Sequence, residues 1–279
     1  MGVKIYGLQL GRFGVDLDHL MWDHPSYMLL PGVRERARVW YQAPINAFVV
    51  EHPDGRILYD TGMSPRWRDE WPAGYRNLAA WEDVQPNEFL AERLQSVGLT
   101  PDDFRYVVAG HLHIDHAGGL RLFEHSQAEV IVHEDELRVA LALEQDAQAY
   151  SLADVRMLAR MRPWIVHGNV EILPGVQLLS LPGHSKGHMG MLVHTENSGA
   201  ILLAADAMYH HEAYGPPPVA TGVTISPERW AESVEKIYRL ATKYEALVVP
   251  GHSVVGVRQH ADGSTSFEDI RFGPDAAYE

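Results

Sequence analysis

The feature that most constrains this chain is AGHLHIDHAGG at residues 109–119, where three histidines and an aspartate lie within six consecutive positions. It follows the apolar run FRYVVAG, which we expect to be a buried strand. His111 and His113 are two positions apart and can face one side of an extended chain, whereas the adjacent Asp115 and His116 cannot easily aim at the same point. The spacing therefore predicts two neighbouring metal ions, one held by each pair.

Three further strand ends offer the ligands that two such ions still need. The apolar runs LLSLPGH, AILLAAD and ALVVPGH end at His184, Asp206 and His252. A buried carboxylate such as Asp206 is costly unless it meets a cation, and its two oxygens allow it to bridge two ions. Because the chain has no cysteine, any metal must be held by histidine or carboxylate. The four strand ends must then meet at one edge of the fold.

The rest of the sequence alternates between strand and helix patterns, with no linker between them. This predicts one α/β domain over residues 1–279, built as two sheets with helices outside. The acidic, polar tail after His260 is expected to pack loosely. We expect strands at 3–10, 38–52, 56–59, 104–110, 128–132, 170–173, 176–181, 189–194, 200–205 and 246–250, and helices at 86–99, within 134–160 and at 227–243.

Net charge and hydropathy limit the classes of partner that we expect for this protein. The formal net charge of −14 repels phosphate backbones and argues against nucleic acid as the partner. The N-terminus has no signal-peptide pattern, and no apolar run approaches the roughly 18 residues of a membrane span. We therefore expect a cytoplasmic protein without a membrane partner, which the absence of cysteine fits.

The ligand pattern resembles the metallo-β-lactamase superfamily. The motif H-x-H-x-D-H at residues 111–116 is followed in the same order, and after similarly long gaps, by His184, Asp206 and His252, and YDTG at 59–62 resembles an early strand-end motif of that superfamily. The resemblance covers about residues 38–256. It implies the αββα sandwich, the metallo-β-lactamase fold.

Within the superfamily, the chain is most similar to the N-acyl-homoserine lactonases, which are quorum-quenching enzymes. VEHPDGRILYDTG and HLHIDHAGG are typical of them, and Tyr209 follows Asp206 by three positions in DAMY. The resemblance implies two divalent ions, usually zinc, although iron, cobalt or manganese suit such sites. His111, His113 and His184 would hold one ion; Asp115, His116 and His252 would hold the other; Asp206 would bridge them.

The same resemblance implies a lactone as the small-molecule substrate. A hydroxide bridging the two ions would attack the lactone carbonyl, and Tyr209 would donate a hydrogen bond to its oxygen. Asp115 would carry a proton to the leaving oxygen. For the acyl chain we expect an apolar groove with Met21, Trp22 and Phe48, joined by Trp67 or Trp71.

Several alternatives remain open. Pyridoxolactone-hydrolysing relatives share the tyrosine, so another lactone or ester is a rival substrate, and a glyoxalase-type thioester hydrolase is a second rival. β-Lactamases, phosphodiesterases and nucleases use the same metal set, although the negative charge disfavours nucleases. A metal-binding protein without activity, and Tyr209 as a packing residue, are the further alternatives. A homodimer is compatible with the sequence.

We expect Asp60 to order a strand-end turn or a ligand histidine, and His188 to support the ligand loop rather than bind metal.

Overall fold

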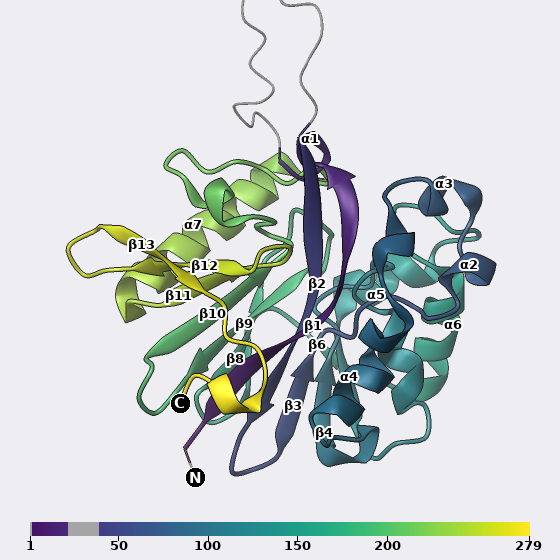
Figure 1. The fold of residues 1–279 in the computed structure, drawn as a ribbon, viewed down its shortest axis with the longest axis horizontal. Coiled ribbons are helices and arrows are strands. Elements are labelled where there is room, and N and C mark those ends of the chain that lie inside the picture. The colour runs from purple at the N-terminus through teal and green to yellow at the C-terminus, as the bar shows by residue number, and fades with distance from the viewer. Residues whose placement is uncertain (1, 22–38) are drawn as a thin grey trace, which may run out of the picture.

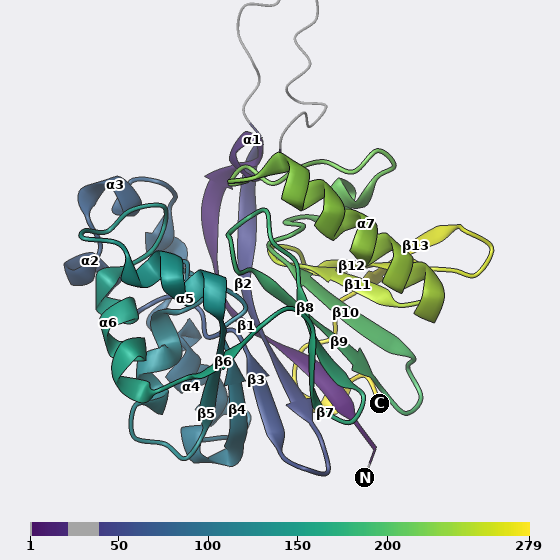
Figure 2. The same cartoon turned by 180° about the vertical axis from the view of Figure 1, so that it is seen from behind.

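Two mixed sheets pack face to face, with helices on their outer sides, in the computed structural model (Figures 1 and 2). The model describes residues 2–21 and 39–279. The helices labelled α2 to α6 lie outside the first sheet, and α7 lies outside the second (Figure 1). The predicted αββα sandwich is confirmed.

The first sheet has the strand order β1-β2-β3-β4-β5-β6. The pairs β1–β2 and β2–β3 are antiparallel, whereas β3 to β6 run parallel. Carboxyl ends of parallel strands meet at one edge of a sheet, which brings the loop after β4 to the site described below. The strands are β1 (Lys4–Asp16), β2 (Trp40–Glu51), β3 (Arg56–Tyr59), β4 (Phe104–Val108), β5 (Glu129–His133) and β6 (Trp164–Val166).

The second sheet has the order β13-β12-β11-β10-β9-β8-β7, and only β10 and β11 pair in parallel among its described strands. All six residues of β10 are buried, because one face meets the other sheet and the other face meets α7. The strands are β7 (Val170–Leu173), β8 (Val176–Ser180), β9 (Met189–His194), β10 (Ala200–Ala205), β11 (Leu247–Pro250), β12 (Val255–Gln259) and β13 (Thr265–Asp269).

Two of the predicted helical regions are each divided into shorter elements. The helix expected at 86–99 is a 3₁₀ turn at Pro86–Glu88 followed by a helix that begins at Leu90, and the region 134–160 contains two helices. The helices are α1 (Leu17–Leu20), α2 (Trp67–Glu70), α3 (Ala73–Arg76), α4 (Leu90–Ser96), α5 (Glu134–Leu141), α6 (Leu152–Met161) and α7 (Pro227–Tyr244).

Helix α7 follows the rules of an amphipathic helix. The side chain of Ser226 caps it by accepting a hydrogen bond from the backbone N–H of Arg229, and Pro227 occupies its first position. Its buried residues, which include Val234, Ile237 and Ala241, recur every three or four positions and face the second sheet.

The C-terminal tail is ordered, so the prediction of loose packing is wrong. Tyr278 is buried and exchanges two backbone hydrogen bonds with Ile5 in β1, at 2.8 and 2.9 Å. The two chain ends therefore lie close together, as Figure 1 shows. Buried Ile270, the pairing of β13 with β12 and backbone bonds to Gly7 add to this anchor, although the overall composition of the tail is polar. Among the described residues, no helix is both long and apolar enough to cross a membrane.

Candidate metal centre

All seven predicted ligands meet at one edge of the two sheets. The loop after β4 carries His111, His113, Asp115 and His116, and the loop between β8 and β9 carries His184. Asp206 follows β10 directly, and His252 follows β11 after one glycine. Potential metal-binding atoms of these residues form three overlapping groups, each with its atoms within 4.8 Å of one another.

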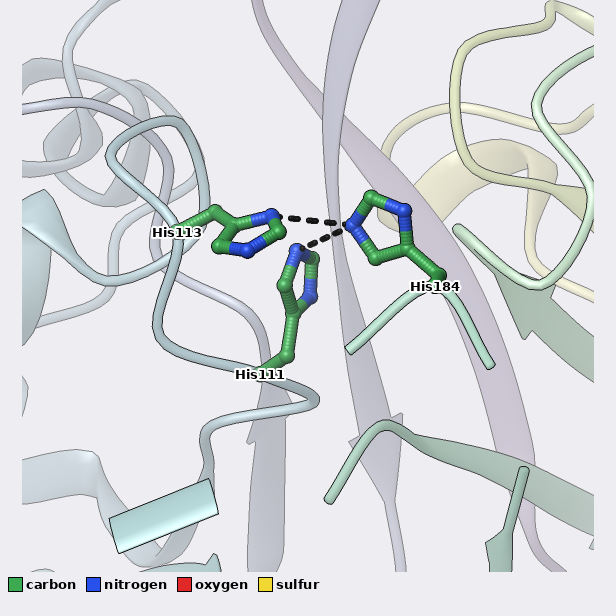
Figure 3. A group of neighbouring side chains, drawn as sticks. All are labelled: His111, His113 and His184. Atoms are coloured by element: carbon green, nitrogen blue, oxygen red, sulfur yellow. Dashed lines mark hydrogen bonds between the residues drawn. The ribbon is translucent and has the colours of Figure 1, made fainter. Parts of the chain in front are cut away.

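The first group consists of His111, His113 and His184, whose rings converge (Figure 3). Nε2 of His184 lies 3.1 Å from Nε2 of His111 and 2.9 Å from Nδ1 of His113. Nδ1 of His184 donates to the carbonyl oxygen of Val223 at 2.7 Å, which leaves a lone pair on its Nε2. Burial lowers the pKa values of His111 and His113 well below the usual histidine value, so these rings are neutral, the form that binds metal.

The second group consists of Asp115, His116 and His252. Oδ2 of Asp115 lies 3.7 Å from Nε2 of His116 and 3.6 Å from Nε2 of His252. Burial opposes protonation of both histidines, but the nearby carboxylates, Asp206 foremost and Asp115 with it, together outweigh burial and raise their pKa values. Asp115 is the more exposed member, at 12% of its side chain.

Asp206 lies between the two groups. Its Oδ2 is 3.2 Å from Nε2 of His116 and 3.5 Å from Nε2 of His252 in the second group. The same oxygen is 3.4 Å from Nε2 of His184 and 3.7 Å from Nε2 of His111 in the first. This position is the one that a bridging carboxylate requires.

The residues fit a pair of divalent cations. Nε2 of His116 and Oδ1 of Asp206 are buried and have no hydrogen-bond partner in the part of the chain that the structure describes. Unpaired buried polar atoms are rare because burying them without a partner costs free energy. Here they lie in a cluster whose nitrogen and oxygen atoms face one another, as the ligands of a metal ion would. Imidazole and carboxylate donors are those that zinc, iron, cobalt and manganese accept.

Two residues around the ligands have the roles expected from the sequence. The Asp60 carboxylate, at the end of β3, accepts hydrogen bonds from Nδ1 of His116 and the backbone N–H of Gly110, both at 2.8 Å. Nε2 of His188 accepts from the backbone N–H of Asp206 at 3.1 Å. Such contacts fix the orientation of metal ligands.

The glycines after the ligand motif are required by close packing. A Cβ at Gly118 would lie 2.0 Å from the backbone nitrogen of Ser64, and one at Gly119 would lie 2.3 Å from the carbonyl oxygen of Thr61. The loop that carries His116 therefore packs directly against the segment after β3, which carries Asp60.

Tyr209 lies beside both ligand groups. Its ring packs edge-on against His184 and His252, with centroids 5.4 and 5.0 Å away. Its hydroxyl oxygen is 3.4 Å from Nδ1 of His184. Burial, reinforced by the Asp206 carboxylate, raises the pKa of Tyr209 well above its usual value, so the phenol stays protonated and can donate a hydrogen bond.

A pocket reaches the ligands from one side. Its polar wall includes His113, Asp115, Asp206, Tyr209 and His252. The rest of its lining is mostly apolar and comes from β1, α1 and four loop segments: Phe13, Val15, Leu20, Leu78, Ala79, Trp81, Ile114, Ala149 and Val223, together with His19. The pocket thus joins a candidate metal centre to an apolar groove.

Four of the residues predicted to hold the acyl chain do not line this pocket. Phe48 is buried in the core between the sheets, and Met21 is buried where its backbone pairs with Thr221. Trp67 and Trp71 pack against each other in the core and do not line the pocket. The predicted residue Trp22 lies outside the described residues.

Phe13 and Trp81 are the aromatic residues that line the apolar part of the pocket, and the sequence analysis did not select them. Their ring centroids are 4.6 Å apart. Strict alternation from Leu8 and Leu10 would have placed Phe13 on the opposite face of the strand. The register of β1 shifts between Gln9 and Arg12, and this irregularity brings Phe13 into the same core as Leu8 and Leu10. For Trp81 the sequence offers only its place in an aromatic loop.

Comparison with known proteins identifies the family. A family model described as the metallo-beta-lactamase superfamily matches residues 40–252. The chain belongs to this superfamily. It is 33% identical to the N-acyl homoserine lactonase AiiB of Agrobacterium fabrum, over 90% of this chain and 94% of the relative, and 31% identical to AiiA of Bacillus thuringiensis subsp. kurstaki, over 90% and 93%.

Solved structures agree with this assignment to the metallo-beta-lactamase superfamily. An N-acyl homoserine lactone hydrolase with the product N-hexanoyl-L-homoserine at its catalytic metal centre superposes with a TM-score of 0.75 and 29% identity, covering 90% of this chain and 93% of the other. The dizinc lactonase AidC superposes with a TM-score of 0.70 at 16% identity, covering 98% and 96%, and supports the fold alone.

Proposed function

We propose that this protein is a metal-dependent hydrolase that opens the ring of N-acyl-homoserine lactones. The observation that carries the proposal is the pocket in which the ligand cluster, a protonated Tyr209 and an apolar wall meet. Relatives over most of the chain are N-acyl homoserine lactonases, which favours this substrate class over other esters.

We propose that two divalent ions, with zinc as the expected metal, occupy the cluster. His111, His113 and His184 would hold one ion, Asp115, His116 and His252 the other, and Asp206 both. Bound there, such ions polarise a carbonyl and lower the pKa of water towards neutrality. Iron, cobalt and manganese remain acceptable substitutes.

Tyr209 would stabilise the oxyanion that develops on the lactone carbonyl. Its phenol is protonated and faces the ligand cluster, so it can donate a hydrogen bond without a preceding proton transfer. A donor held in a water-poor site stabilises developing charge more than one in bulk water, because little reorganisation is needed.

Asp115 would move a proton to the leaving oxygen. It lines the pocket and is the most exposed member of the second ligand group. Opening a lactone releases an alkoxide that must be protonated, and a carboxylate within reach can relay that proton. The apolar lining, with Phe13, Leu20 and Trp81, would hold the acyl chain.

The test is a pH-stat assay of purified, metal-loaded protein with N-butanoyl- and N-decanoyl-homoserine lactone. Hydrolysis converts a neutral lactone into a carboxylic acid, so we expect steady acid release that stops after chelation. Release from a simple lactone or a glutathione thioester, without release from either homoserine lactone, would favour the rival substrates instead. A cytoplasmic location and a homodimer stay predictions.

A further inference from the structure

Glu136, in the first turn of α5, is a fully buried carboxylate outside the ligand set. Its Oε1 accepts hydrogen bonds from the backbone N–H of Leu112 at 3.0 Å and the hydroxyl of Tyr150 at 2.8 Å. Its Oε2 accepts from the hydroxyl of Ser185 at 2.7 Å and the backbone N–H of Gly187 at 2.9 Å. Burial raises the pKa of the carboxyl, and these four donors oppose that rise.

Three of the four donors belong to the two loops that carry the first ligand group. Leu112 stands between His111 and His113, and Ser185 follows His184. One carboxylate therefore ties together two loops that come from different sheets. Among the described residues, none of the hydrogen bonds to Glu136 comes from the loop that carries His252 of the second group.

Tyr150 adds a direct contact with a ligand ring. Its ring packs edge-on against His113, with centroids 4.9 Å apart, and the backbones of the two residues form an isolated β-bridge. The hydrogen bond from its hydroxyl to Glu136 fixes the position of this ring. Glu136 thus acts on His113 through both Leu112 and Tyr150.

The close approach of the second loop depends on Gly187. A Cβ at this position would lie 2.3 Å from the backbone nitrogen of Glu136, closer than real Cβ contacts allow. Burying an isolated carboxylate is expensive, and a solvent-exposed acid would serve the helix N-terminus equally well. Helix capping alone therefore does not explain why this carboxylate is buried between the two loops.

We infer that Glu136 is a positioning residue that sets the separation of the two loops and so preorganises His111, His113 and His184 for metal. The inference rests on the metal centre of the proposed function, but it concerns metal affinity and does not depend on which ester is cleaved. Glu136 would then support the first ligand group as Asp60 supports the second.

The test uses Glu136→Gln, which keeps the size of the side chain. An amide has one acceptor oxygen, and its NH₂ group would face donors, so at least one backbone N–H of Leu112 or Gly187 loses its acceptor. The metal-free protein is titrated with Zn²⁺ against a competing chelator to obtain both dissociation constants. Loss of such a supporting contact typically weakens metal binding about 10–100-fold.

We expect one dissociation constant to rise by about this factor, the other to stay unchanged, and the thermal stabilisation by metal to shrink. The matched control is Asp154→Asn, which neutralises another buried carboxylate, one that accepts a hydrogen bond from Arg121 at 2.9 Å. It should lower the melting temperature of the metal-free and metal-loaded forms equally and leave both constants unchanged.

Glu136→Gln would overturn the inference if it behaved like this control. If Glu136→Gln does not fold, Ser185→Ala replaces it as the test, because it removes one of the four hydrogen bonds to Glu136. A smaller rise of the same dissociation constant would support the positioning role, and two unchanged dissociation constants would refute it. Wild-type protein that binds metal but opens no homoserine lactone would refute the proposed substrate while leaving this result intact.

Discussion

The two ligand groups differ in how their histidines are held in place. In the second group, the ring nitrogens that face away from the centre are both bonded, Nδ1 of His116 to the Asp60 carboxylate at 2.8 Å and Nδ1 of His252 to the carbonyl oxygen of Pro44 at 2.9 Å. In the first group, Nδ1 of His184 is bonded to the carbonyl oxygen of Val223 at 2.7 Å, but Nδ1 of His111 has no hydrogen-bond partner in the described parts of the chain. There, the Glu136 carboxylate holds backbone atoms of the loops instead.

The groups also differ in their access to the pocket. The second group contributes Asp115 and His252 to its lining, and the first contributes only His113. His111 and His184 are completely buried. The first group is therefore shielded and held largely through its loops, with one ring bonded at Nδ1, while both histidines of the second group are bonded at Nδ1 and this group lies more open to the pocket. Substitutions should therefore separate the groups.

Asp206→Asn should have the largest effect, because Asp206 is the residue whose oxygen lies near histidines of both groups. We expect both ions to be lost and lactone hydrolysis to fall by at least about 100-fold, the upper end of what losing a mere supporting contact costs. Metal analysis and the pH-stat assay on the same preparation check this. A variant that kept both metal and rate would remove Asp206 from its bridging role.

Tyr209→Phe should spare both groups and slow the reaction. Removing one hydrogen-bond donor to a developing oxyanion typically costs ~10²–10³ in kcat, equivalent to roughly 3–4 kcal/mol. We expect a loss of that size in kcat with unchanged metal content. An unchanged kcat would make Tyr209 a packing residue, as the sequence alone also allowed.

Asp60→Asn should affect the second group more than the first. Asp60 has a φ of 60°, a left-handed conformation that asparagine tolerates, so the backbone need not change. An amide has one acceptor oxygen, so the variant cannot keep the hydrogen bonds from both Nδ1 of His116 and the backbone N–H of Gly110. It also no longer makes the His116 ring more basic, and we expect about 10-fold weaker binding of one ion. Combined with Glu136→Gln, the variant gives a crossed test: equal weakening of both constants by either substitution would erase the distinction between the groups.

The convergence of the seven candidate ligands was predictable from the sequence because each stands in a loop that leaves an apolar strand. A run such as AILLAAD indicates a strand and its end at once, and Asp206 is then a buried carboxylate that needs a cation. The layers were predictable for the same reason, since strand and helix periodicities differ. That residues 1–279 form one domain stays a prediction.

The pocket and Glu136 could not be predicted because both depend on approach between distant segments. Phe48 is an apolar strand residue like Phe13, and only the packing of the two sheets decides that one is core and the other lines the pocket. A glutamate in the first turn of a helix usually favours the helix dipole at the surface. Glu136 is buried because the loop containing Gly187 packs on its backbone.

The most direct test of the central claim measures metal content and lactone opening together, in protein as purified, after chelation and after metal is returned. We expect about two ions per chain, loss of N-acyl-homoserine lactone hydrolysis when these ions are removed, and recovery of hydrolysis when they are restored. Full hydrolysis by metal-free protein would contradict it.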